Sequence, residues 1–370
     1  MRYSVEPITT GEGFSSLEPD WNRLSDSASS PNVFMTFDWF RAWNQRLTQE
    51  DRSGRRRPSV LVLKRDGAVA GISPLIHRTA SQFGYAVRKL EFAGGHADYN
   101  DFVLGNDPPG QIDAIADFLT QTQDQWDLVD LRDLREAGNT LALIEGALSR
   151  AGLRYRVLRE NGRCPYLPID TGSATTMKKL SGHVRRTLRK RMERATALGL
   201  RTRIIESPHQ ELGLLDKLIA VEHQKHLHGK LSRPFIASYR EVFQSLFDTL
   251  GPRGWVYIAF MEQGDRPVAW QVGFCCGKAL WDYNKAYDHA FAQFAPGTIL
   301  VSAVLDYGFS HGYEEYDFLR GEEPYKTVWS TGFHQPYRLL VWSGRWTARA
   351  RAFVYLDLKT AAYRLFGKKE

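Results

Sequence analysis

Residues 287–326 read YDHAFAQFAPGTILVSAVLDYGFSHGYEEYDFLRGEEPYK, and this stretch holds the clearest signals of fold in the chain. Within it, Ala295–Thr298 follows an expected strand and a short loop, and opens a helix that runs to about His311. The first N–H groups of a helix have no intrahelical partner, and Gly297 lets a ligand approach the backbone closely. The helix start is therefore either a site for an anion such as a pyrophosphate, or an ordinary helix start with proline near its first position.

A short strand and a polar loop end this stretch. Residues 315–319 are expected to form the strand, which carries Asp317. The loop after it holds side chains that can bind anions, move protons or form ion pairs, namely Arg320, Glu322, Glu323, Tyr325 and Lys326. Purely structural interpretations stay open beside the functional one, because Asp317 can cap the loop and Arg320 can pair with Glu322.

Two expected hairpins, one in each half of the chain, resemble each other. VLVLKRDGAVAGISPLI (60–76) aligns with VYIAFMEQGDRPVAWQVGF (256–274), and each is a strand, a charged turn and a strand that opens near Val-Ala. The similarity predicts an internal duplication, or only that two hairpins look alike. Gly, Pro and polar residues gather at 161–172, so we predict two domains, 1–165 and 166–370.

Both halves alternate expected strands and helices. In the first half, the expected strands are 59–64, 68–77, 87–93, 127–131 and 153–158, and the expected helices are 111–123 and 139–151. In the second half, further expected strands are 200–206, 255–261, 267–275, 279–287 and 338–342, with helices at 175–198, 211–226, 235–250 and 345–366. This alternation predicts a mixed α/β fold in both domains.

The composition is that of a globular protein whose positive charge lies in its second half. Hydrophobic residues make up 43% of the 370, which is enough for real cores. No apolar run approaches the roughly 20 residues that span a bilayer, and the first residues lack the apolar core of a signal peptide. The net charge of +7 divides into −2 for residues 1–165 and +9 for residues 166–370. A nucleotide cofactor, an acidic sugar, nucleic acid or a membrane face would suit this charge.

The expected helix 175–198 holds much of the positive charge. Its segment KKLSGHVRRTLRKRMER (178–194) has apolar residues at every fourth position and basic residues around the rest, including Arg185 and Arg189. We favour a clamp on phosphate or carboxylate groups of a substrate. Contact with nucleic acid or a membrane, and a merely solvated helix face, are the alternatives.

Cysteine and histidine patterns indicate neither disulfides nor a metal. Cys164, Cys275 and Cys276 cannot form a disulfide framework and have no zinc spacing, which suits a reducing, cytoplasmic location. His223, His226 and His228 form a small cluster, but His228 does not share the helical face of the others. We therefore expect no metal.

Taken together, these motifs resemble a known family. The run Phe294-Ala295-Pro296-Gly297, Gly312 and Asp317-Phe318-Leu319-Arg320-Gly321-Glu322 up to Tyr325-Lys326 looks like the GNAT-type acetyltransferases of the CelD (cellulose biosynthesis) class, which are relatives of the FemAB aminoacyl transferases. Supporting similarities lie at Trp21 to Trp43, at Gly95 with Asp98-Tyr99-Asn100-Asp101, and along the basic helix. The block 317–326 is the most specific of them.

The resemblance implies a fold and a donor. The fold would be α/β (α+β), with two tandem GNAT-like domains, each a central mixed β-sheet flanked by helices. The donor would be acyl-CoA, such as acetyl-CoA, with its pyrophosphate on the turn formed by Ala295, Pro296, Gly297, Thr298 and Ile299. The simple GNAT pattern has more glycine in this turn than QFAPGT (293–298), so an aminoacyl-tRNA donor stays open.

Transfer from a thioester to an amine needs a bound electrophile, a neutral amine and help for the leaving thiolate. Asp317 is the first choice for the carboxylate that takes the proton, with Asp288, Asp98 and Asp101 as others. Tyr283 or Tyr325 could protonate the thiolate, and Lys326 could bind an acyl oxygen. The candidate substrate-binding residues are Arg320, Glu322, Lys285, Asp288, Asp98, Asp101, Arg185 and Arg189.

These inferences predict an N-acyltransferase that moves an acyl group from acyl-CoA to an amine or hydroxyl of a sugar- or peptide-like acceptor. The resemblance places it in exopolysaccharide or envelope metabolism. A FemAB-like transferase that uses charged tRNA is the first alternative, and a non-catalytic scaffold that binds a glycan or a protein partner is the second. Apart from tRNA in the first alternative, no nucleic-acid partner is expected, and the oligomeric state is left open.

Overall fold

The structure is a computed structural model that describes residues 3–28, 30–51, 54–82, 85–135, 138–170, 172–178, 180–226 and 234–345. The expected helix 345–366 falls outside these ranges except for its first residue. The chain divides into two units. Of the described residues, unit 1 contains those up to 28, then 34–161 and 335–345, and unit 2 contains 30–33 and 162–334. Among the described residues, no helix is long and apolar enough to cross a membrane.

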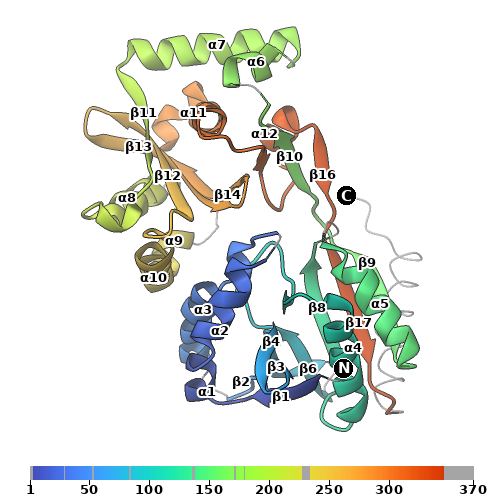
Figure 1. The fold of residues 1–370 in the computed structure, drawn as a ribbon. Helices are drawn as coiled ribbons and strands as arrows, with labels where there is room; N and C mark the ends of the chain where they lie inside the picture. The colour runs from blue at the N-terminus through green and yellow to red at the C-terminus, as the bar shows by residue number, and fades with distance from the viewer. Residues whose placement is uncertain are drawn as a thin grey trace. The chain divides into compact units, whose positions relative to one another are not determined.

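Unit 1 is an α/β fold with two sheets (Figure 1). The first sheet has the order β1 (Ser4–Ile8), β3 (Val60–Arg65), β4 (Ala68–Ser73), β7 (Val103–Leu104). The second has the order β2 (Arg56–Pro58), β5 (Leu75–Gln82), β6 (Tyr85–Phe92), β8 (Leu128–Leu134), β17 (Tyr337–Trp342), β9 (Arg154–Arg159). Its helices are α1 (Gly11–Ser15), α2 (Glu18–Asp26), α3 (Phe37–Glu50), α4 (Pro108–Gln121) and α5 (Thr140–Arg150).

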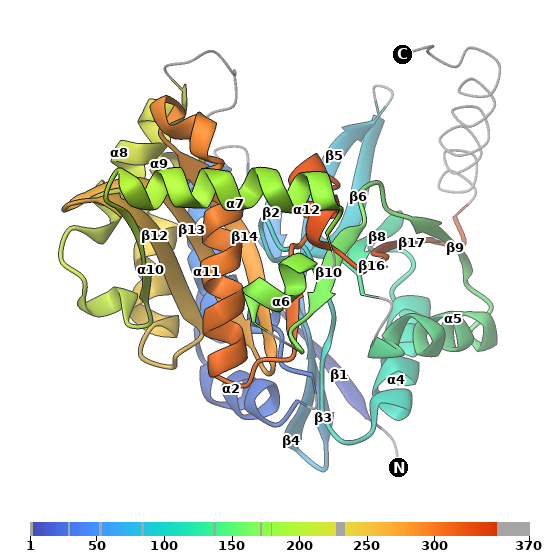
Figure 2. The ribbon, with the colours of Figure 1, turned by 90° about the horizontal axis from the view of Figure 1, so that it is seen from above.

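Unit 2 has one mixed sheet of seven strands. Their order is β11 (Leu200–Ile205), β12 (Val256–Gln263), β13 (Arg266–Cys276), β14 (Ala279–Tyr287), β15 (Glu315–Asp317), β10 (Cys164–Pro168), β16 (Gly332–His334). The helices are α6 (Ser173–Lys178), α7 (Gly182–Ala197), α8 (Leu214–His226), α9 (Phe235–Ser238), α10 (Arg240–Leu250), α11 (Pro296–Ser310) and α12 (Pro324–Trp329). In Figure 2, α7 lies across α11. The expected fold class, two tandem α/β units built on mixed sheets, is confirmed.

The two units share a sequence of elements. Each contains the expected hairpin, β3–β4 in unit 1 and β12–β13 in unit 2. Each unit then has a parallel pair of strands joined through a buried helix. In unit 1 the strands are β6 and β8 and the helix between them in sequence is α4. In unit 2 the strands are β14 and β15 and the helix is α11. Such a crossover places the start of the helix beside the carboxyl end of the first strand. In unit 2 this is the start of α11, for which the sequence leaves open an anion site or an ordinary helix start.

Strand β17 corrects the expected domain division. The prediction assigned residues 166–370 to the second domain, but β17 pairs with β8 and β9 and so belongs to unit 1. Leu339, Leu340 and Val341 are fully buried there. Arg338 donates two hydrogen bonds to the buried carboxylate of Asp130, at 2.6 and 2.8 Å. The division of a chain at one linker cannot reveal a strand that returns to the first unit.

Two long helices expected from the sequence are each interrupted. The expected helix 175–198 is α6 and α7, because the hydroxyl of Ser181 caps α7 by accepting a hydrogen bond from Val184 N. The expected helix 235–250 is α9 and α10, which meet at Tyr239. Strands β10 and β16 and helix α12 were not expected, since each has only three to six residues.

The carboxyl group of Asp101 in unit 1 makes stability depend on pH. It accepts hydrogen bonds from Phe102 N and interacts with Thr140, while burial raises its pKa from 3.8 to about 6. The folded chain therefore holds this proton more tightly than the unfolded chain, and stability falls as the pH rises from about 4 to 6. We expect Asp101→Asn to raise the free energy of unfolding at pH 7 by up to about 3 kcal/mol and to leave it unchanged near pH 4. Melting temperatures of both proteins across this pH range test this, and parallel pH profiles would contradict it.

Candidate active site

A pocket of about 680 Å³ in unit 2 lies where three segments meet. They are the second half of β14, the start of α11, and the loop that leads from β15 into α12. Its lining residues are Asp282, Tyr283, Asn284, Lys285, Tyr287, Ala292, Ala295, Pro296, Gly297, Thr298, Arg320, Glu323, Pro324, Tyr325 and Lys326. Pockets at the carboxyl ends of strands beside a helix start commonly bind phosphate-bearing ligands.

A β-bulge in β14 brings two charged side chains to the pocket. Val272 on β13 pairs with Asn284 and Gly273 pairs with Asp282, so Tyr283 is the extra residue. In a regular strand, residues three apart lie on opposite faces, whereas the bulge lets Asp282 and Lys285 meet. They form an ion pair with 2.5 Å between Asp282 Oδ2 and Lys285 Nζ. The Asp282 side chain is only 1% exposed.

Burial and neighbouring charges shift the pKa values of two pocket residues, Lys285 and Tyr325. Burial lowers the pKa of Lys285, although Asp282 opposes this shift, and the positive charge of Lys326 adds to it. The Lys285 Nζ atom lies 4.6 Å from the centre of the Tyr325 ring. Burial, followed by the negative charges of Asp282 and Glu323, raises the pKa of Tyr325. The Tyr325 hydroxyl therefore stays protonated at neutral pH and can donate a hydrogen bond.

The start of α11 exposes its backbone to the pocket. Ala295 precedes it with a left-handed φ of 54°, a conformation that costs a non-glycine residue about 1–3 kcal/mol. No side chain caps this helix end among the described residues. A Cβ atom on Gly297 would meet only Lys285 Cδ, at 3.7 Å, so packing within the chain does not require glycine here. The space beside Gly297 is open to a ligand.

The loop after β15 is fixed by a lysine. Leu319 is buried and has a left-handed φ of 53°. Lys326, whose side chain is 7% exposed, donates a hydrogen bond from Nζ to Arg320 O at 2.7 Å and pairs with Glu323 at 3.1 Å. Lys326 thus holds the loop that carries Arg320 to the pocket.

The structure brings nine of the predicted site residues together. Tyr283, Lys285, Ala295, Pro296, Gly297, Thr298, Arg320, Tyr325 and Lys326 all line the pocket. The Tyr283 ring also packs against Phe274, with 5.2 Å between ring centres. Ile299 is instead buried in the hydrophobic core. The sequence interpretation missed Asp282, because only the bulge places it beside Lys285, and a bulge has no signature in strand alternation.

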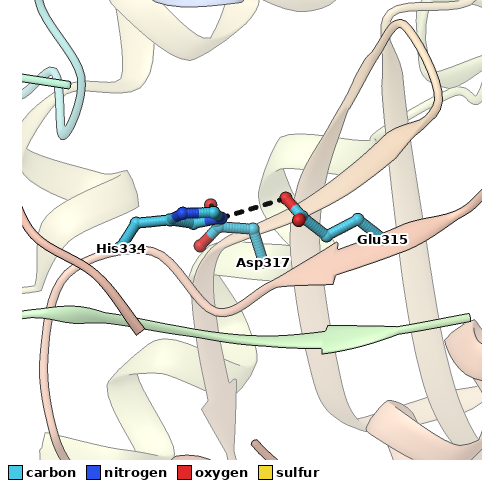
Figure 3. Close-up of side chains that lie close together, drawn as sticks. All are labelled: Glu315, Asp317 and His334. Carbon is cyan, nitrogen blue, oxygen red and sulfur yellow. Dashed lines mark hydrogen bonds and ion pairs between the residues drawn. The ribbon is translucent and has the colours of Figure 1, made fainter. Parts of the chain in front are cut away.

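Asp317 does not line the pocket. Its Oδ1 atom accepts a hydrogen bond from Leu319 N at 2.7 Å, which is the loop-capping alternative, and its Oδ2 atom lies 3.9 Å from His334 Nε2. His334 Nε2 is also 3.3 Å from Glu315 Oε1 (Figure 3). Tyr316 alternates with Glu315 and Asp317 along β15, and it is Tyr316 that packs into the core with α11.

Other predicted site residues have structural partners elsewhere. Asp288 caps the turn before α11 by accepting a hydrogen bond from Ala290 N, and it pairs with Arg266. Glu322 pairs with Arg163, not with Arg320. Arg185 and Arg189 are exposed on α7, where Arg185 donates to Lys178 O and Arg189 lies near Glu193. Asp98 and Asp101 belong to unit 1. The side chains of His226 and His228 lie outside the described residues.

Comparisons with known proteins agree with the architecture of unit 2. Residues 182–327 match the acetyltransferase (GNAT) domain family. FemX is a similar solved structure, with a TM-score of 0.56 at 14% identity over 90% of this chain and 96% of FemX. The C-terminal domain of a putative lysylphosphatidylglycerol synthetase from Agrobacterium fabrum has a TM-score of 0.54 at 13% identity, over 92% of this chain and 96% of that domain. No curated protein matches.

A conserved protein of unknown function from Bacteroides thetaiotaomicron is also similar, with a TM-score of 0.53 at 11% identity over 92% of this chain and 100% of that one. At these identities, the likeness to solved structures concerns the fold alone. The family match is independent of it and spans α7 to α12, which includes every segment of the pocket. Residues 182–327 are therefore similar to an acetyltransferase (GNAT) domain, and the fold of the chain is similar to that of FemX.

Proposed function

We propose that unit 2 transfers an acyl group from acyl-CoA to an amine, or alternatively a hydroxyl, of a sugar- or peptide-like acceptor. The observation that carries this proposal is the pocket in which the open start of α11, the Asp282–Lys285 ion pair and the Tyr325 hydroxyl meet. The match of residues 182–327 to an acetyltransferase domain supports an acyl thioester as the donor. The CelD-like motifs favour an acceptor from exopolysaccharide or envelope metabolism.

The donor would lie along the start of α11. Its pyrophosphate would accept hydrogen bonds from the first backbone N–H groups of the helix, and the helix dipole favours negative charge at this end. Helix α7 packs against the turn that leads into α11 and carries exposed Arg185, Arg186, Arg189, Lys190 and Arg194. This positive surface would complement the phosphates of CoA, which extends the proposed role of Arg185 and Arg189.

Each charged or polar residue of the pocket would have a separate role in acyl transfer. The amine nitrogen bonds to the acyl carbon as the carbon–sulfur bond breaks, and Asp282 takes the amine proton directly or through a water molecule. Lys285 would orient the Asp282 carboxylate through their ion pair. The Tyr325 hydroxyl donates a hydrogen bond to the departing thiolate, which then takes a proton from water. Arg320 would bind the acceptor, and Lys326 would position the loop that carries Arg320.

A second donor, aminoacyl-tRNA, follows from the resemblance of the motifs to the FemAB aminoacyl transferases and from the single glycine in the turn. A specific observation favours the smaller donor. Helix α7 is the longest helix of unit 2 among the described residues and has 16 residues, so no long helical arm is inserted there. We therefore retain acyl-CoA as the proposed donor.

Replacement of Gly297 tests the proposed donor site. We expect Gly297→Trp to fill the open space beside the start of α11 and to weaken acetyl-CoA binding by at least about 10-fold, a loss of 1.4 kcal/mol. Gly11→Trp, at the start of α1 in unit 1, where φ is not left-handed and a Cβ meets nothing within 4 Å, is the matched control. Calorimetric titration of the wild-type chain and both variants measures the effect. Equal affinities in all three proteins would place the donor elsewhere.

A further inference from the structure

One cluster of ligating side chains lies outside the pocket and has no part in the proposed reaction. It consists of Glu315 and Asp317 on β15 and His334 on β16. One donor atom from each residue lies within 4.8 Å of the other two. We propose that these three residues bind one divalent first-row transition-metal ion, such as Zn²⁺ or Mn²⁺.

The spacing of the donors suits such an ion. His334 Nε2 is 3.3 Å from Glu315 Oε1 and 3.9 Å from Asp317 Oδ2. A tetrahedral ion with bonds of about 2.1 Å holds its ligand atoms about 3.4 Å apart. Figure 3 shows the imidazole directed at both carboxylates, so small side-chain rotations would close the shell. Three protein ligands leave a position for water.

The charge and chemistry of the donors also favour a divalent cation. Asp317 is fully buried, and its carboxylate shares a small volume with that of Glu315. A metal-bound imidazole is neutral, so the two carboxylates would supply the negative charge that balances a divalent ion. Carboxylate oxygens with one imidazole and no sulfur suit Zn²⁺, Mn²⁺ or Fe²⁺ better than soft metals.

The neighbouring strand β10 fixes the histidine in place. Tyr166 on β10 pairs in register with Asp317 on one side and Gly332 on the other. Its ring stacks on the His334 imidazole, with 4.3 Å between ring centres and 16° between planes. A Cβ on Gly332 would lie 2.6 Å from the Tyr166 ring, so glycine is required for this stacking. Mutation of residues that hold a metal ligand in place typically lowers the affinity for the metal by 10–100-fold.

The site would connect to the loop beside the pocket. Asp317 already holds Leu319 N, and Arg320, which lines the pocket, follows directly. A bound ion would therefore hold the end of β15 and the start of this loop. The sequence alone predicts no metal, because Glu315 and His334 are 19 residues apart and only strand pairing brings them together.

Metal titration of the full chain, after treatment with EDTA and desalting, tests the proposal. We expect Zn²⁺ to bind with one ion per chain by calorimetry and to raise the melting temperature. His334→Gln and Asp317→Asn should each weaken binding by more than about 100-fold, and Gly332→Ala by about 10–100-fold. The matched control is His311→Gln, since His311 is exposed on the same unit beside Glu206.

A second measurement does not depend on variants that fold. Co²⁺ added to the wild-type chain should give the visible absorption of a low-symmetry site with nitrogen and oxygen ligands, and Zn²⁺ should remove it. The proposal is overturned if the wild-type chain binds no stoichiometric Zn²⁺ and gives no Co²⁺ spectrum. It is equally overturned if His334→Gln binds Zn²⁺ as tightly as the His311→Gln control, since the cluster would then be only an ion-paired network.

Discussion

Asp282→Asn is expected to lower the rate of acyl transfer by about 10²–10⁴-fold, the usual contribution of a general base. Asparagine has nearly the same volume as aspartate, so the bulge in β14 and the pocket should keep their shape. The variant leaves Lys285 without the partner of its ion pair, so its melting temperature is compared with that of the wild type. The loss should appear in kcat, since the base acts in the transition state.

The matched control for this variant is Asp265→Asn, on the exposed turn between β12 and β13. We expect it to transfer acyl groups at the wild-type rate. Asp317→Asn is the informative comparison, because the sequence favours Asp317 as the base while the structure places it outside the pocket. A larger loss of kcat in Asp317→Asn than in Asp282→Asn would contradict the assignment of the base.

Arg338→Met is expected to destabilise unit 1 by about 3 kcal/mol at neutral pH, because it leaves a buried carboxylate without its main partner. Burial alone would raise the pKa of Asp130, but hydrogen bonds and charge from Arg338, with the charge of Lys89, hold it below its usual range. Lys89 Nζ lies 3.2 Å from Asp130 Oδ2 and is not changed by the substitution, so we expect a loss of stability at the lower end of the range for buried pairs.

The sign of the pH dependence makes this prediction specific. A lowered carboxyl pKa stabilises the folded chain above the unfolded pKa of about 4, and this stabilisation is lost as the pH falls through the folded value. The difference between wild type and Arg338→Met in urea unfolding should therefore shrink below about pH 4. Arg156→Met, exposed on the adjacent strand β9, is the control. If Arg156→Met lowered the free energy of unfolding as much as Arg338→Met does, the proposed role of the Arg338–Asp130 pair would be contradicted.

Much of the fold could be predicted because the relevant signals are local. Short apolar runs on either side of a charged turn indicate the hairpins β3–β4 and β12–β13, and helical spacing with Gly297 near the start indicates α11. The segments that line the pocket were also predicted, since they are continuous in sequence around 295–298 and 320–326. These features depend on the 2- and 3.6-residue periods and on helix-start chemistry.

The rest depends on contacts between distant residues. The bulge at Tyr283 arises from the pairing of β13 with β14, and it alone joins Asp282 to Lys285. The pairing of β17 with β8 and β9 returns residues 337–342 to unit 1, which no boundary signal predicts. The sequence favours Asp317 as the base because it ends a strand beside the helix, but its side chain lies on the face of β15 opposite to Tyr316 and the core.

The most direct test of the central claim is a transfer assay with the full chain, acetyl-CoA and a panel of amino sugars and amine-bearing peptides. Release of the CoA thiol and the mass of each acceptor are followed together, and a parallel series contains aminoacyl-tRNA in place of acetyl-CoA. The account predicts amine-dependent thiol release with one acetyl group added to the acceptor. Acceptors that gain an amino acid only from aminoacyl-tRNA, or no transfer from either donor, would contradict it.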